Sequence, residues 1–181
     1  MLAAFVLSLA PAQAQTLTER IEQCGACHGA DGNSTMEKIP SLAGQPEFFI
    51  LNQLILIREG VRPIEAMQDA VKNLKDGDIV AIAAHFNKLI AKPAGDPPDP
   101  ALVARGSQLS TKLRCTSCHG PTLTGDQQMP RLAKQRIDYM SAALKEYRDN
   151  KRKGADTAMT AVIYGLNDAD IDAIAHYAAS R

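Results

Sequence analysis

Two short stretches of the chain combine residue types that could bind a metal or a cofactor. Residues 24–28 read Cys-Gly-Ala-Cys-His, and residues 115–119 read Cys-Thr-Ser-Cys-His. Cysteine pairs at this spacing occur in redox-active dithiols, in zinc sites and in the covalent attachment of haem. The chain of 181 residues contains four cysteines, so these two motifs account for all of them.

The rest of the sequence separates the three chemistries. A thioredoxin-type dithiol needs a βαβ context, and no segment alternates apolar and polar residues as a strand would. A structural zinc site joins cysteine pairs about 15 to 20 residues apart, whereas these pairs begin at residues 24 and 115. Covalent haem also explains the histidine, because two thiols bond to the haem vinyl groups and the adjacent imidazole binds the iron.

The sequence therefore predicts two covalently bound haem c groups. The predicted thioether residues are Cys24, Cys27, Cys115 and Cys118, and the predicted proximal iron ligands are His28 and His119.

The two motifs lie at equivalent positions of an internal repeat. PSLAGQ from Pro40 matches PRLAKQ from Pro130, and AMQDAVKNLKDGDIVAIAAHF from Ala66 matches AMTAVIYGLNDADIDAIAHYA from Ala158. The intervening segment AKPAGDPPDP is rich in proline, which interrupts helices and favours an extended linker. We expect a first domain over 15–92, a linker over 93–100 and a second domain over 101–181.

Both copies are predicted to be helical throughout. Thr16 and Glu19 form a capping-box pattern at the start of the first helix. Helices are expected over 46–59 and 135–149, with Gly60 and Asn150 supplying left-handed stops. Each copy closes with an amphipathic helix in which aspartate is expected to act as the cap. The predicted fold class is all-α.

A haem iron with six ligands needs a distal ligand opposite histidine, and methionine is the usual one in cytochromes c. Met67 and Met159 are the only methionines at equivalent positions of the repeat, so we predict them as distal ligands. Met36, Met129 and Met140 have no methionine counterpart and are interpreted as packing residues.

The N-terminus resembles a signal peptide. Residues 2–10 are apolar, too few to span a bilayer, and Ala12-Gln13-Ala14 supplies small residues for cleavage. No lysine or arginine precedes Arg20, so the usual positive region is absent, and a buried N-terminal helix is the alternative. We expect residues 1–14 to be a signal peptide and the protein to be periplasmic. The formal net charge of zero gives no electrostatic argument for nucleic acid or an anionic membrane as partner.

As a set, the motifs resemble the class I cytochromes c, and their tandem arrangement resembles the dihaem cytochrome c4 family over essentially the whole mature chain. This resemblance implies two haem domains that face each other about a pseudo-twofold axis. It also implies that the backbone carbonyls of Pro40 and Pro130 accept hydrogen bonds from His28 and His119. The chain departs from this family in that its first domain lacks a long N-terminal helix.

Saturated iron coordination predicts electron transfer rather than catalysis, because histidine and methionine together leave no open site. We expect a carrier of single electrons between a redox donor and an acceptor, such as a membrane-bound oxidase or a periplasmic dehydrogenase. The alternatives are a haem enzyme of thiosulfate dehydrogenase or peroxidase type, and a dedicated haem subunit of a dehydrogenase.

One apolar stripe is present in the first copy only. Phe48, Leu51 and Ile55 align with Asp138, Ser141 and Lys145 of the second copy. Residues at these spacings share one helix face, so the stripe is either covered by the first domain itself or forms a contact surface.

Overall fold

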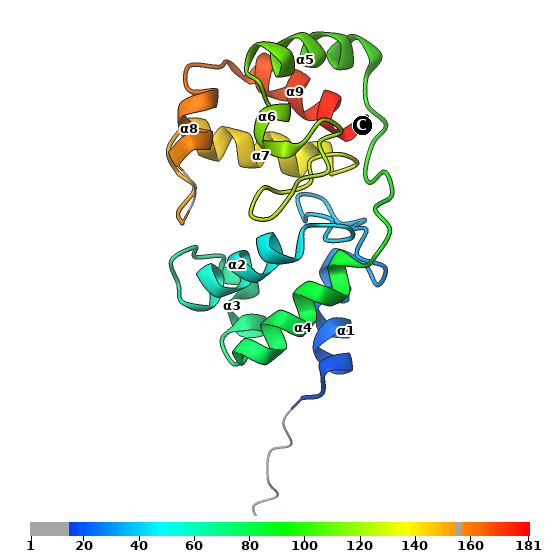
Figure 1. The fold of residues 1–181 in the computed structure, drawn as a ribbon, viewed down its shortest axis with the longest axis vertical. Helices are drawn as coiled ribbons and strands as arrows, with labels where there is room; N and C mark the ends of the chain where they lie inside the picture. Colours follow the sequence, from blue (N-terminus) through cyan, green and yellow to red (C-terminus); the bar gives the residue numbers. More distant parts are fainter. Residues whose placement is uncertain (1–14, 155–156) are drawn as a thin grey trace, which may run out of the picture.

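The computed structural model describes residues 15–154 and 157–181, and it divides into two helical lobes (Figure 1). Within these residues the fold is all-α as predicted, with one isolated β-bridge between Asp126 and Met129. The expected signal peptide, residues 1–14, lies outside the described residues. No helix in the described part of the chain is both long and apolar enough to cross a membrane.

The first lobe contains the helices that precede the linker. These are α1 (Leu17–His28), α2 (Glu47–Arg58), α3 (Glu65–Val71) and α4 (Asp76–Asn87). The second lobe contains α5 (Pro100–Lys112), α6 (Thr116–His119), α7 (Ile137–Arg148), α8 (Thr157–Ile163) and α9 (Asp168–Ala179).

The segment between α4 and α5 has no helix and runs along one side of the molecule (Figure 1). Lys92 pairs with Asp31 of the first lobe at 2.7 Å. At the other end, the Asp99 backbone amide donates to Nδ1 of His176 on α9 at 2.9 Å. The linker is therefore attached to a lobe at each end.

Local signals begin and end several helices where the sequence predicts. Thr16 and Glu19 form the capping box of α1, and Gly60 and Asn150 follow α2 and α7 with φ of +70° and +53°. The prediction of aspartate caps on the closing helices is wrong, because the N-cap is Lys75 in α4 and Asn167 in α9. Aspartates lie instead in the first turn of both closing helices, where a carboxylate is stabilised by the helix dipole.

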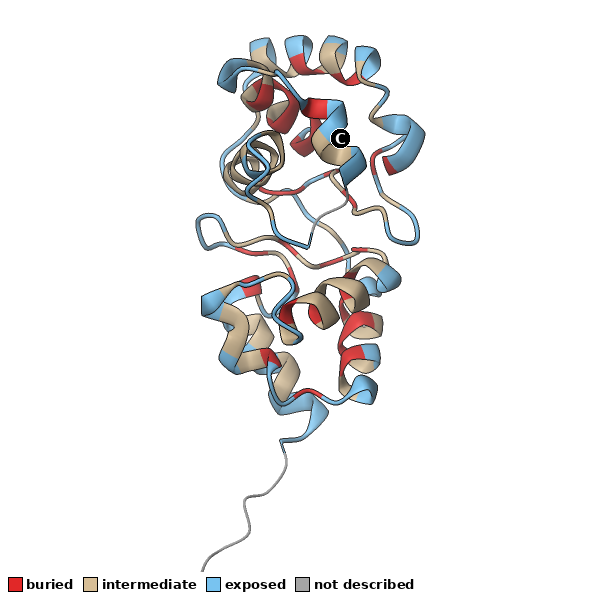
Figure 2. Ribbon diagram, turned by 90° about the vertical axis from the view of Figure 1, so that its left-hand side faces the viewer, coloured by how far each residue is buried: buried red, intermediate tan, exposed pale blue. Residues whose placement is uncertain are grey.

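Buried residues lie in the helices of both lobes and in the segments between them (Figure 2), and the two core clusters differ in composition. The first is a cluster of large side chains from α2, α3 and α4: Ile50, Leu54, Ile57, Val71, Leu74, Ile79, Ile82, Ala83 and Phe86. The second cluster contains smaller residues: Leu123, Ala133, Met140, Ala175, Ala178 and Ala179.

The second lobe has an additional helix, α5, ahead of the helix α6 that ends at His119. Gly106 on α5 lies so close to α9 that a Cβ atom there would collide with the carbonyl of Ala173. The absence of a side chain lets the two helix backbones approach each other closely, so α5 itself covers α9. In the first lobe α1 begins at Leu17, only eleven residues before His28, and it has no equivalent extension.

Loops from both lobes meet between them in a reciprocal arrangement. The Gln45 side chain accepts from the Arg131 amide at 2.9 Å and donates to the Arg131 carbonyl at 3.0 Å. The Gln135 side chain accepts from the Ser41 amide at 2.8 Å and donates to the Ser41 carbonyl at 2.9 Å. Because the four residues occupy equivalent repeat positions, this interface has local pseudo-twofold symmetry, as the family resemblance implies.

Candidate haem sites

Each Cys-x-x-Cys-His motif ends at a buried histidine. His28 is the last residue of α1 and is 7% exposed, and His119 is the last residue of α6 and is 5% exposed. Nδ1 of His28 lies 2.8 Å from the carbonyl oxygen of Pro40, and Nδ1 of His119 lies 2.9 Å from that of Pro130. The contacts implied by the family resemblance are therefore present in both lobes.

These contacts determine what the imidazoles can do. A carbonyl oxygen can only accept, so Nδ1 must carry the proton, and Nε2 keeps a lone pair that can bind a metal. Burial lowers the pKa of both histidines, and the hydrogen bond to the prolyl carbonyl offsets part of this shift. Both rings are thus held in the neutral form and tautomer that a metal ligand requires.

The loop after each histidine brings the proline back to it. Gly29 and Gly120 follow the histidines with φ of +86° and +80°, a conformation that favours glycine. In the first lobe the carbonyl of Gly32 accepts from the amides of Leu42 and Ala43, which closes the loop just after Pro40. In the second lobe the carbonyl of Leu123 does the same for residues 132 and 133.

None of the four cysteines forms a disulfide, so all four are available for attachment to haem. Cys24 and Cys115 are half-buried and pack against the cores of their lobes, whereas Cys27 and Cys118 are exposed. Burial raises the pKa of Cys24 and of Cys115. The paired thiols are three residues apart in helical backbone, so they project from the same side, as attachment to two neighbouring vinyl groups requires.

The predicted distal ligands lie on two short helices that the sequence did not indicate. Met67 is on α3, half-buried, and packs against the first core. Met159 is half-buried on α8. Of the other methionines, Met36 is exposed and Met140 is part of the second core. Equivalent placement of Met67 and Met159 keeps them as candidates, and their ligation stays a prediction.

Sequence reasoning missed several polar residues between the lobes. Gln45 and Gln135 occupy the same position in the two copies of the repeat. A matched glutamine can be buried or exposed, so the sequence alone did not indicate that these two lie at the interface. Tyr139 is a second such residue: its hydroxyl accepts from Arg152 at 3.2 Å, and this arginine and Arg62 of the first lobe both lower its pKa against the effect of burial. Its counterpart in the repeat is Phe49, so the interface is not fully symmetric.

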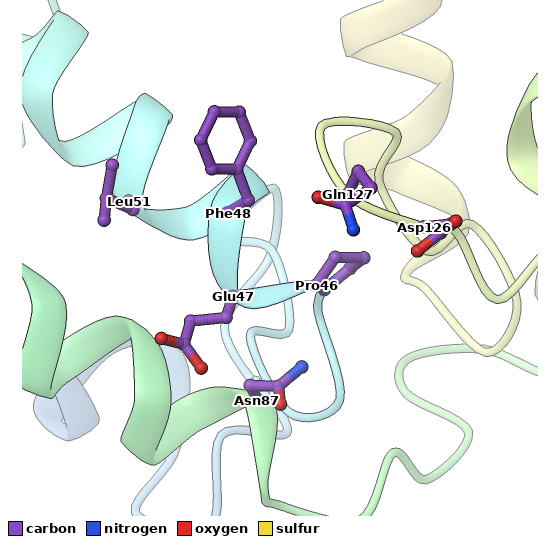
Figure 3. A pocket seen from close by; sticks show the side chains of 7 residues that line it. All are labelled: Pro46, Glu47, Phe48, Leu51, Asn87, Asp126 and Gln127. Carbon is purple, nitrogen blue, oxygen red and sulfur yellow. The ribbon is translucent and has the colours of Figure 1, made fainter.

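The apolar stripe on α2 is split by the fold. Leu51 and Ile55 are half-buried and pack against the first lobe's own core, whereas Phe48 is 50% exposed. Phe48 and Leu51 line a groove of about 320 Å³ that also includes Asp126 and Gln127 of the second lobe (Figure 3). The stripe thus contributes to the first core and leaves one large side chain, Phe48, at the edge of the interface.

The buried imidazoles with a free Nε2, and the thiols beside them, fit two covalently attached haems. The fold and these sites define a protein of two tandem class I cytochrome c domains. A family model for cytochrome c matches residues 103–180, and one for subunit III of cbb3-type cytochrome c oxidase matches residues 10–86.

Comparison with known proteins identifies which group of cytochromes c the chain resembles. Cytochrome c4 of Pseudomonas aeruginosa is 37% identical over 85% of this chain and 81% of its own. The crystal structure of reduced cytochrome c4 from Pseudomonas stutzeri superposes with a TM-score of 0.78 at 32% identity, covering 91% of this chain and 97% of that one. A thiosulfate dehydrogenase electron acceptor of Thiomonas intermedia is 31% identical over 95% of this chain and 84% of its own.

The chain belongs to the cytochrome c4 family. It is a dihaem electron-transfer cytochrome. One haem attaches at Cys24 and Cys27, and the other at Cys115 and Cys118.

Proposed function

We propose that the protein is a carrier of single electrons, without catalytic activity of its own, whose irons are bound by His28 with Met67 and by His119 with Met159. The proposal takes residues 15–92 and 101–181 as the two haem domains and residues 93–100 as their linker. When bound, each haem supplies a one-electron ferric–ferrous couple.

The observation that carries the proposal is the same in both lobes. A buried, neutral histidine is oriented by a prolyl carbonyl, and a methionine lies at an equivalent position of a short helix in each copy. Two protein ligands on each iron leave no open position for a substrate. A methionine ligand and an apolar surrounding also raise the reduction potential, which suits a carrier late in a respiratory chain.

The chain's own residues supply rigidity. The hydrogen bonds of Pro40 and Pro130 hold each imidazole in one orientation and increase its basicity. One cysteine of each pair, Cys24 or Cys115, packs against the core of its lobe and would hold the attached haem there. A site that changes little between oxidation states exchanges electrons quickly, because little has to rearrange.

Relatives suggest one electron donor. The Thiomonas intermedia relative is a thiosulfate dehydrogenase electron acceptor, so a periplasmic dehydrogenase of this kind is a reasonable donor for this chain as well. We propose the periplasm as its location, because c-type attachment and the apolar residues 2–10 both point to export. The acceptor would be a second redox protein, such as a membrane-bound oxidase.

The test replaces each proposed distal ligand separately. Met67→Ala and Met159→Ala should each abolish the methionine-to-iron charge-transfer band of one haem and lower that haem's reduction potential, measured by spectroelectrochemical titration. Met36→Ala and Met140→Ala serve as an exposed and a buried control and should retain both bands. Loss of a band in a control variant, with retention in Met67→Ala or Met159→Ala, would assign the distal ligand to a different methionine.

The same spectra separate a carrier from an enzyme. Two low-spin haems in the native protein, and no oxidation of thiosulfate by the isolated protein, are expected of a carrier. A high-spin haem together with turnover of thiosulfate or peroxide would contradict the proposal.

A further inference from the structure

The lobe interface contains a buried arginine at a position where the repeat has a serine. Arg131 follows Pro130 directly, and Ser41 follows Pro40. Arg131 is 3% exposed. Its backbone amide and carbonyl form hydrogen bonds with the side-chain oxygen and nitrogen of Gln45 in the first lobe. The guanidinium therefore belongs to the centre of the molecule, beside the loop that orients His119.

The guanidinium has one polar contact where five donors are available. Its Nη1 donates to the carbonyl of Ala133, and Nε and Nη2 are buried without a hydrogen-bond partner among the described residues. In the same part of the chain, no carboxylate forms an ion pair with it. Burial without a counter-charge lowers the pKa of Arg131 to about 10, which still leaves the group charged at neutral pH.

The neighbouring Arg136 shows how this interface accommodates a buried arginine that has a partner. It is 8% exposed, and its Nε and Nη2 donate to the two carboxylate oxygens of Asp138 at 3.0 and 2.7 Å. Asp138 also accepts from the backbone amide of Lys38, so its oxygens are already engaged. It is therefore occupied by Arg136 and gives Arg131 no charge partner.

An unpaired buried guanidinium costs several kcal/mol, because the charge loses its hydration and gains nothing in return. An anion from outside the described residues would supply the missing charge and accept from the two buried donors. Each haem carries two propionate carboxylates, and planar carboxylates are the natural partners of the arginine fork.

We propose that Arg131 binds a haem propionate at the lobe interface, with Nε and Nη2 as the donors. It is a positioning residue of the haem, and it makes the two sites electrostatically unequal because Ser41 cannot replace its charge. A nearby positive charge stabilises the ferrous form of a haem. The haem whose propionate binds Arg131 therefore has a higher reduction potential than it would have without this residue. This inference uses the two haems but is independent of the distal ligands and of the donor.

The test measures the potentials of three holoprotein variants. In Arg131→Gln the ferrous-to-ferric ratio of one haem at fixed applied potential should fall on the order of tenfold, which is about 59 mV for a one-electron couple. Arg131→Lys retains the charge and should retain most of the potential. Arg105→Gln removes the same charge from the surface of the second lobe and should leave both potentials nearly unchanged.

Redox titration followed by NMR identifies the haem involved, because the methyl signals of each ferric haem can be assigned to its lobe. A shift confined to the haem of His119, or to that of His28, supports the proposal and identifies which propionate is bound. Equal potentials in Arg131→Gln and Arg105→Gln overturn it.

If the substitutions at Arg131 prevent haem attachment, the proposal can be tested on the native ferric protein by NMR. In protein labelled with ¹⁵N-arginine, the Nε–H of a propionate-bound Arg131 should exchange slowly with solvent and show a paramagnetic shift. Fast exchange without such a shift would contradict the proposal.

Discussion

Phe86 in the first lobe and Ala178 in the second occupy equivalent positions of the closing helices α4 and α9. Phe86 is fully buried among large aliphatic side chains, whereas α9 is rich in alanine and is covered by α5. Both lobes bury aliphatic side chains, but the second has alanine where the first has Phe86 and brings the backbones of α5 and α9 together. A repeated haem-binding unit can therefore keep its site while its packing changes.

What the lobes share lies close to the haem motifs. Both copies contain the histidine, the proline three residues before the alanine of the loop, and the interface glutamine. The copies differ in the core and the N-terminal helix, and at Arg131 and Tyr139 in the interface.

The largest effect is expected from removing the aromatic side chain of the first core. Phe86→Ala gives α4 the residue of α9 without the helix that compensates for it, so a cavity remains. We expect a loss of about 3–5 kcal/mol in the free energy of unfolding of the first lobe. Urea denaturation of the ferric holoprotein measures it.

Phe86→Leu is the matched control, because it retains most of the apolar volume and should cost clearly less. If Phe86→Ala costs less than about 1 kcal/mol, the first lobe relaxes around the substitution and the two packing modes are interchangeable.

The sequence predicted those parts of the fold that depend on local or repeated patterns. The Thr16 capping box, the stops at Gly60 and Asn150 and the apolar faces of α4 and α9 are signals within a few residues of one another. The short helices α3 and α8, seven residues each, have too few turns for a periodic signal. Their positions are set by tertiary packing, so Met67 and Met159 were found by comparing the copies and not from helix patterns.

The interface could not be predicted in the same way. A side-chain amide that hydrogen-bonds to the backbone of another lobe produces no periodic sequence pattern. Gln45 and Gln135 were therefore recognisable only as identical residues at equivalent repeat positions. Arg131 was visible only as the departure from Ser41 in an otherwise similar motif. The stripe of Phe48, Leu51 and Ile55 was read as one surface, but the structure packs Leu51 and Ile55 against the first core because α2 is covered on more than one side.

A smaller effect is expected where α5 crosses α9. Gly106→Ala places a Cβ atom against the carbonyl of Ala173, which is backbone and cannot move away without displacing a helix. The free energy of unfolding of the second lobe should fall by about 1–3 kcal/mol, as measured by urea denaturation.

Gly77→Ala on α4 is the control for the intrinsic effect of alanine in a helix. No heavy atom lies within 4 Å of the Cβ position there, so this variant should be neutral or more stable by up to about 1 kcal/mol. Equal effects of the two substitutions would show that close approach to α9 is not what the second lobe depends on.

The smallest effects should come from the two interface glutamines, and their pattern matters more than their size. The Gln45 side chain accepts from the backbone amide of Arg131, and that of Gln135 accepts from the amide of Ser41, with N–O distances of 2.9 and 2.8 Å. Each hydrogen bond should slow the exchange of that amide with solvent. A net hydrogen bond of about 1 kcal/mol corresponds to somewhat less than a tenfold change in an equilibrium. Gln45→Ala should therefore accelerate hydrogen exchange of the Arg131 amide several-fold and leave Ser41 nearly unchanged, while Gln135→Ala should do the reverse. NMR-detected exchange of the two amides measures both. If either variant accelerates both amides equally, the interface opens as one cooperative unit, and its symmetry is then a property of the whole contact and not of two independent clamps.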